Sequence, residues 1–146
     1  MGLFQAFNIS ASGMTAQRFR TDIIAENIAN VNTTSTESGE PYRRKVVTFS
    51  EKNVTPFSQY FSNSKNSLVG NGVKVSKVTE DYETDFVQVY DPANPDADEN
   101  GYVYYPNVNT VTEMTNLIDA TRAYEANATA FDASKTMAQA GLQIGQ

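Results

Sequence analysis

The chain has 146 residues, of which 40% are hydrophobic, and its formal net charge is −6 at pH 7. This length suits one domain, or one small domain carried on a pair of helices. Eleven basic residues stand against seventeen acidic ones. A nucleic-acid partner requires clustered Lys and Arg that displace counterions, so the charge balance argues against nucleic acid.

Cysteine, histidine and tryptophan do not occur in the sequence. Without Cys, no disulfide framework holds the fold together. Without His and Cys, the common catalytic triads, thiol chemistry and His-bearing metal sites are excluded. We therefore expect no cofactor and no metal.

Hydropathy bears on the location of the protein. No stretch approaches the roughly 18–20 apolar residues of a membrane span, so we expect no direct membrane insertion. The N-terminus also lacks the basic region, apolar run and cleavage site of a signal peptide. If the chain leaves the cytoplasm, we expect it to do so without a cleaved signal.

Residues 1–32 read as a first long helix, which should begin near residues 3–8 and end near Asn30. Its apolar residues follow the alternating step of three and four that places side chains on one helix face. Gly13 weakens the helix by up to about 1 kcal/mol and permits close approach of a second helix. The first stripe comprises Phe7, Ala11, Met14, Ile23, Ile24 and Ile28, and a second row beside it includes Ile9 and Ala16.

Residues 33–109 read as loops and short strands, because turn-forming residues interrupt short β-type runs. Asn71-Gly72 predicts a tight turn before the second strand. We expect exposed loops at 31–41 and 50–69 and a turn-rich excursion at 91–101. The predicted strands are 42–49, 73–75, 85–90 and 102–105.

Residues 110–146 read as a second long helix, extending to about Gly141. Thr110 and Glu113 match a capping box, in which each side chain bonds the backbone amide of the other. The apolar stripe comprises Met114, Leu117, Tyr124, Ala128, Phe131, Ala138 and Leu142. The predicted fold is therefore α+β, with a coiled-coil-like pair of long terminal helices around a small β-hairpin or strand region.

The two stripes admit two interpretations: an antiparallel pair within the chain, or additional contacts between chains. We expect the second, because the apolar faces are wide and the β region looks too small to cover them. Asn27, Asn30 and Thr33 are included because polar side chains there close the helix end and fix the following loop against a neighbour. The predicted assembly interface is Phe7, Ile9, Met14, Ile23, Asn27, Ile28, Asn30, Thr33, Met114, Leu117, Tyr124, Ala128, Phe131 and Leu142.

Charged clusters offer weaker alternatives. Residues 96–101 resemble the opening of an EF-hand loop, but Asn107 stands where a bidentate Glu is required, and a hairpin turn at Asn100-Gly101 explains them better. Glu80, Asp81, Glu83 and Asp85 form an acidic cluster that could supply the carboxylate pair of a glycosidase. On a strand, Asp81, Glu83 and Asp85 would share one face, where they would most often be solvated. The basic run 43–45 is either a solvated strand edge or a contact for an acidic neighbour.

Several segments resemble flagellar basal-body rod proteins. The Asn-x-x-Asn-x-x-Thr pattern at Asn27, Asn30 and Thr33 is similar to the signature shared by the rod and hook family. Segments 89–97, 99–103, 105–109 and 122–127 are similar to proximal-rod members. The segments that resemble the start of rod proteins are 10–14, 16–17, 24–34 and 39–45.

The resemblance implies a non-enzymatic structural subunit of the bacterial flagellum. Such subunits stack helically, with other rod proteins, into a hollow shaft that crosses the periplasm, carries torque and conducts exported subunits. They leave through the flagellar type III export apparatus, and helix faces without an internal partner would become ordered only on assembly. One alternative is another type III secretion polymer, such as an inner rod or needle. The other is a glycan hydrolase using Glu83 and Asp85.

Overall fold

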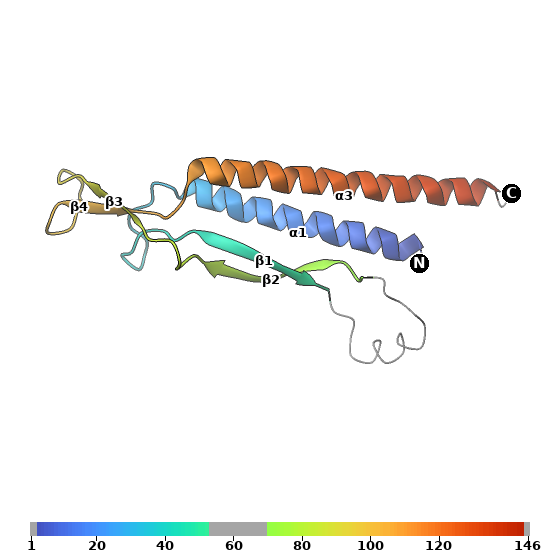
Figure 1. Ribbon diagram of the computed structural model, residues 1–146, viewed down its shortest axis with the longest axis horizontal. Helices are drawn as coiled ribbons and strands as arrows, with labels where there is room; N and C mark the ends of the chain where they lie inside the picture. Colours follow the sequence, from blue (N-terminus) through green and yellow to red (C-terminus); the bar gives the residue numbers. More distant parts are fainter. Residues whose placement is uncertain (1–2, 53–69, 145–146) are drawn as a thin grey trace, which may run out of the picture. The chain divides into compact units, whose positions relative to one another are not determined.

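The computed structural model describes residues 3–52 and 70–144 (Figure 1). Within these described residues, two helices flank four strands along the sequence, which confirms the predicted α+β class. The predicted loop at 50–69 falls largely outside the described residues, although Ser50 and Glu51 belong to the first strand. The elements are α1 (Leu3–Ala29), β1 (Lys45–Glu51), β2 (Val73–Glu80), β3 (Val87–Tyr90), β4 (Tyr102–Tyr105) and α3 (Thr110–Ile144).

The chain divides into two compact units, of which the first is built from three separate segments and the second from two. Unit 1 comprises Met1–Phe19, Phe49–Ser76 and Ala120–Gln146. Unit 2 comprises Arg20–Thr48 and Lys77–Asp119 with the remaining parts of the same helices and strands.

In unit 1, α1 packs against α3 on one side and against the strands on the other. The rings of Phe7 and Phe131 lie 4.9 Å apart between centroids. A Cβ atom added at Gly13 would lie 2.5 Å from Oδ1 of Asn127, so the predicted close helix approach is confirmed. Towards the strands, the Val73 amide donates to the Ser12 hydroxyl at 3.1 Å. The strands thus cover part of the wide α1 surface that the sequence analysis assigned to neighbouring chains.

Strands β1 and β2 form a two-stranded sheet. The Lys52 amide donates to the Gly72 carbonyl in unit 1, and the Asp81 amide donates to the Arg44 carbonyl in unit 2, as expected for antiparallel strands. The predicted tight turn at Asn71-Gly72 is wrong. Gly72 instead begins the strand region with φ +93° where a Cβ would collide with the Ser12 side chain, so both conformation and space require glycine.

Strands β3 and β4 form a separate antiparallel hairpin. The predicted bounds of β4 are confirmed, whereas β3 begins at Val87 rather than at residue 85. The hairpin loop closes with Gly101 at φ +81° and a hydrogen bond from its amide to the Asp98 carbonyl. Carboxylate Oδ1 of Asp98 accepts from the amides of Asn100 and Tyr102. These bonds build the turn that the sequence favoured over an EF-hand.

Helix α3 begins at Thr110 as predicted, but the predicted capping box is wrong. Asn109 is the N-cap, because its Oδ1 accepts from the Thr112 amide at 3.1 Å. The Glu113 amide bonds the Asn109 carbonyl, and the Glu113 carboxylate bonds residues of other elements. The helix continues to Ile144, three residues beyond the predicted end at Gly141.

Candidate assembly surfaces and the polar network behind them

A buried polar network, formed by Asn27, Tyr42, Arg44 and Glu113, lies at the centre of unit 2. Asn27 is 1% exposed, and its Oδ1 accepts from the Lys45 amide and the Tyr42 hydroxyl, both at 2.9 Å. Its Nδ2 donates to the Lys45 carbonyl at 2.9 Å and to Oε2 of Glu113 at 3.1 Å. Asn27 thus joins α1, the start of β1 and α3.

Glu113 completes the network from the α3 side. Its Oε1 accepts from Nε and Nη2 of Arg44 at 2.9 and 2.8 Å. Asn107, also buried, accepts from the Arg44 amide at 2.8 Å and donates to the carbonyls of Asp81 and Thr84. Each buried side chain therefore has hydrogen-bond partners, which is the condition for a buried polar cluster to stabilise a fold.

Two side chains in this region have shifted pKa values. Burial, together with the negative charges of Glu26 and Glu113, raises the pKa of Tyr42 to about 12. Burial also raises the pKa of Asp81, but hydrogen bonds from Thr84 and Glu83 and the charge of Arg44 outweigh it. The pKa of Asp81 therefore lies below its ordinary value.

The basic run 43–45 follows neither of the two predicted interpretations. Arg44 pairs with Glu113, and its Nη1 lies 3.5 Å from Oδ2 of Asp81. Lys45 pairs with Glu26 at 2.5 Å. The Arg43 guanidinium lies 4.5 Å from the ring centroid of Tyr82 and 4.2 Å from that of Phe86. All three cations thus contact side chains of their own chain.

Asn30 and Thr33 close the end of α1. Asn30 Nδ2 donates to the Glu26 carbonyl at 2.9 Å, and the Thr33 hydroxyl donates to Asn30 Oδ1 at 3.2 Å. The Tyr42 amide then bonds the Thr33 carbonyl, which fixes the loop that follows the helix. The predicted closure of the helix end is observed, and it acts within the chain.

The predicted interface residues separate into an inward group and an outward group. The inward group is half-buried or buried in the folded chain and comprises Phe7, Ile9, Met14, Ile23, Asn27, Ile28, Asn30, Thr33, Leu117, Ala128 and Phe131. The outward group comprises Met114, Tyr124 and Leu142, which are 55%, 41% and 75% exposed. Only the outward group presents a largely open side chain to a partner.

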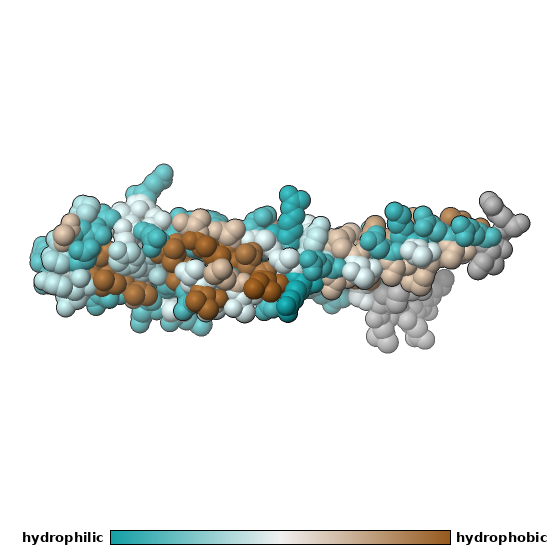
Figure 2. All heavy atoms as spheres, turned by 90° about the horizontal axis from the view of Figure 1, so that it is seen from above, coloured by the Kyte–Doolittle hydropathy of each residue, from teal (hydrophilic) through white to brown (hydrophobic). Residues whose placement is uncertain are grey.

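An exposed apolar row that the sequence analysis missed lies at the start of α3. Val111 and Ile118 are 74% and 53% exposed, and Met114 lies between them. Steps of three and four place these three side chains, here called the α3 row, on one helix face. The hydrophobic patch in the space-filling view of Figure 2 includes this part of the surface. The step of three and four was the available signal, but the sequence analysis assigned Met114 to the stripe that continues through Leu117 and left out Val111 and Ile118.

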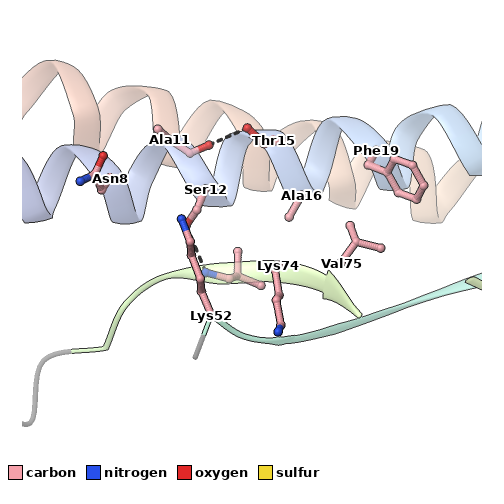
Figure 3. A pocket seen from close by; sticks show the side chains of 10 residues that line it. Asn8, Ala11, Ser12, Thr15, Ala16, Phe19, Lys52, Lys74 and Val75 are labelled. Atoms are coloured by element: carbon pink, nitrogen blue, oxygen red, sulfur yellow. Dashed lines mark hydrogen bonds between the residues drawn. The ribbon is translucent and has the colours of Figure 1, made fainter. Parts of the chain in front are cut away.

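A second surface is a groove between α1 and the β1–β2 strands in unit 1, about 480 Å³ in volume. Its apolar lining includes Ala11, Ala16 and Val75, and Phe19 stands partly exposed beside them. In Figure 3, Lys52 extends towards α1 beside Ser12, whereas Lys74 points away from the helix. We call this surface the α1–β2 groove.

The acidic residues at 80–85 do not share the strand face that the sequence predicted. β2 ends at Glu80, and Asp81 begins a turn in which its carboxylate accepts from Glu83 and Thr84. Glu80 accepts from the Tyr82 hydroxyl at 2.5 Å.

Across residues 3–52 and 70–144, no group of three acidic residues is placed to hold a metal ion. Nor does either helix, within those residues, have the length and apolarity needed to span a membrane.

Comparison with known proteins identifies the class to which this fold and these surfaces belong. Residues 7–35 match the family model for flagella basal body rod proteins. Residues 99–144 match the model for the C-terminal part of the flagellar basal body rod FlgEFG proteins. The two matches coincide with most of α1 and with β4 and α3. The chain is therefore a structural subunit of the flagellar basal-body rod.

Curated relatives over the whole length narrow this class. The FlgC rod protein of Bacillus subtilis is 47% identical, and each chain is covered completely. FlgC of Borreliella burgdorferi is 42% identical over 100% of this chain and 99% of its own. FlgC of Escherichia coli O157:H7 is 38% identical over the full length of both. The chain belongs to the FlgC family of flagellar basal-body rod proteins.

Proposed function

We propose that this subunit polymerises, with copies of itself and with other rod proteins, into a hollow helical shaft. The shaft crosses the periplasm, transmits torque and conducts exported subunits, and its subunits arrive through the flagellar export apparatus without a cleaved signal. The observation that carries the proposal is the α3 row. Three large apolar side chains standing open on one helix face are typical of a surface that a partner covers.

The end of α3 supplies a second surface for the same purpose. Phe7 contacts Phe131, and α1 begins only four residues earlier, at Leu3. Because the helices run antiparallel, α3 residues beyond about position 135 extend past the described start of α1. Met137 and Leu142 in this extension are 66% and 75% exposed. We propose that neighbouring rod subunits cover them, together with Tyr124.

The inward group has a different role in this proposal. Phe7, Leu117 and Phe131 hold each unit together, so an Asp at these positions would destabilise the subunit itself. An assembly defect in such a variant would not distinguish folding from polymerisation. The α3 row is the appropriate target, because its side chains contribute little to the fold of the isolated chain.

The test is Ile118→Asp, with Thr112→Asp as the matched control. Thr112 is exposed in the same part of α3 but lies off the row. Both variants are expressed in cells whose own copy of the gene is deleted, and basal bodies are purified and counted. We expect Ile118→Asp to remove rods while the purified monomer unfolds at the wild-type temperature. Normal rods with Ile118→Asp, or equal loss with Thr112→Asp, would refute the proposal.

A further inference from the structure

The side-chain charge is distributed very unevenly between the two units. Unit 1 contains six Lys and Arg and three Asp and Glu, a net charge of +3. Unit 2 contains five basic and fourteen acidic residues, a net charge of −9. No basic residue occurs between Lys77 and Arg122. Two copies of the chain therefore attract each other when unit 2 of one approaches unit 1 of the other.

The β3–β4 hairpin is a largely exposed part of unit 2. All four residues of β3 are exposed, and Val103 is the only fully buried residue in β4. Gln88, Tyr90, Tyr102 and Tyr104 share one face, because directly paired residues point to the same side of a sheet. A two-stranded hairpin is marginally stable alone in water, so a partner that covers this face stabilises it.

The chemistry of the hairpin specifies its partner. Tyr90 and Tyr102 pack edge to face at 5.2 Å and remain 64% and 38% exposed, a combination typical of protein interfaces. Glu99 stands exposed in the loop of the hairpin. The hairpin therefore suits a surface with an apolar lining and a cation at its edge.

The α1–β2 groove has this composition. Ala11, Ala16 and Val75 form an apolar lining, Phe19 offers an aromatic ring, and Lys52 supplies the cation (Figure 3). Its volume, about 480 Å³, lies within the range of pockets that receive side chains of a ligand or partner. The hairpin belongs to unit 2 and the groove to unit 1, and every copy of the chain carries both surfaces.

We propose that the β3–β4 hairpin of one copy docks in the α1–β2 groove of a second copy, with Glu99 facing Lys52. This inference rests on the proposed polymerisation and names one of its contacts. A contact between two different surfaces of identical chains is heterologous, and it generates an open helical array unless the rotation closes a ring. A rod requires contacts of this kind.

Cysteine cross-linking tests the contact directly, because the chain contains no cysteine of its own. Cells lacking their own gene co-express two differently tagged full-length copies, one with Glu99→Cys and the other with Lys52→Cys. Lys74→Cys replaces Lys52→Cys in the control, because Lys74 also borders the groove but its side chain points away from α1 (Figure 3). Basal bodies are purified and oxidised, and the mixed dimer is quantified on denaturing gels.

We expect several-fold more mixed dimer with Lys52→Cys than with Lys74→Cys. Equal yields in basal bodies that contain the chain would overturn the docking and leave the proposed function intact. Absence of the chain from basal bodies, with the wild-type copy as well, would refute both.

Charge exchange provides an independent readout if cysteine prevents assembly. Glu99→Lys and Lys52→Glu should each reduce the number of rods about tenfold, because like charges then face each other across the contact. The double variant should restore rods, whereas Glu99→Lys combined with Lys74→Glu should not. Failure of the first double variant to restore rods, with monomers that remain folded by circular dichroism, would overturn the docking.

Discussion

Arg44 and Glu113, 69 residues apart in the sequence, are joined through a single carboxylate oxygen that accepts from both Nε and Nη2 of the arginine. Glu113 is only 1% exposed, and its other oxygen accepts from Asn27. One carboxylate therefore connects the end of α1, the residue before β1 and the first turn of α3. These hydrogen bonds link three separate segments of unit 2 through one buried side chain.

Removing the carboxylate should therefore be costly. Glu113→Ala leaves Arg44 with only the longer contact to Asp81 and leaves Asn27 without one acceptor. We expect the free energy of unfolding to fall by about 3 kcal/mol, measured by chemical denaturation of the full chain. Glu125→Ala, an exposed acidic residue on the same helix, should change it by less than about 0.5 kcal/mol. Equal effects of the two substitutions would contradict the role of the network.

Tyr42 gives the network a measurable pH dependence. Its pKa rises from 10.0 to about 12 in the fold, so the folded state keeps the phenol protonated where the unfolded state loses its proton. The stability from this difference is present below pH 10 and is lost as the pH rises towards 12. Chemical denaturation should show wild type more stable than Tyr42→Phe at pH 9, with the gap narrowing up to pH 12. A gap that stays constant would refute the assignment.

The effect of Gly13→Ala on the free energy of unfolding should change sign when Asn127 is also replaced by Ala. In the wild-type chain, Gly13→Ala places a Cβ against the Asn127 side chain and should lower the free energy of unfolding by about 1 kcal/mol. With Asn127→Ala the space opens, and the better helix propensity of Ala should then raise it by about 1 kcal/mol. Thermal and chemical denaturation of the four chains in this cycle measure both values. If Gly13→Ala changes the free energy of unfolding in the same direction in both backgrounds, the contact with Asn127 does not decide the effect.

Asn109 and Thr110, which are adjacent at the start of α3, should differ in how much they stabilise the helix. Asn109→Ala removes the acceptor for the Thr112 amide and should cost about 1 kcal/mol in the free energy of unfolding. Thr110→Ala should cost much less, because Thr110 is exposed and is not the N-cap. A larger loss with Thr110→Ala, by chemical denaturation, would restore the capping box that the sequence indicated.

The helices and strands that depend on local periodicity could be predicted from the sequence. The bounds of α1, the start of α3 and all of β4 follow from patterns within a few residues of each other. The sequence analysis missed the buried polar network because Asn27 and Glu113 are 86 residues apart, and no local pattern joins them. The same gap explains the wrong capping box, since Glu113 fits it locally but binds Arg44 instead.

The candidate surfaces could likewise be predicted only in so far as they depend on local pattern. Steps of three and four identified apolar side chains in both helices, but they did not reveal which ones the strands and the partner helix cover. Phe7 and Phe131 contact each other, whereas Met114 is open. Exposure depends on tertiary packing, so Val111 and Ile118 became visible as a surface only in the folded chain.

Methionine oxidation tests most directly the claim that the α3 row is covered by neighbouring subunits in the rod. Met114 is 55% exposed, and Met14, which is half-buried in α1, serves as the internal reference. Purified monomer and purified basal bodies are treated with hydrogen peroxide, and sulfoxide formation at each methionine is followed by mass spectrometry. We predict that Met114 oxidises faster than Met14 in the monomer and becomes protected at least about fivefold in basal bodies. Oxidation of Met114 at the same rate in monomer and basal bodies would contradict the account.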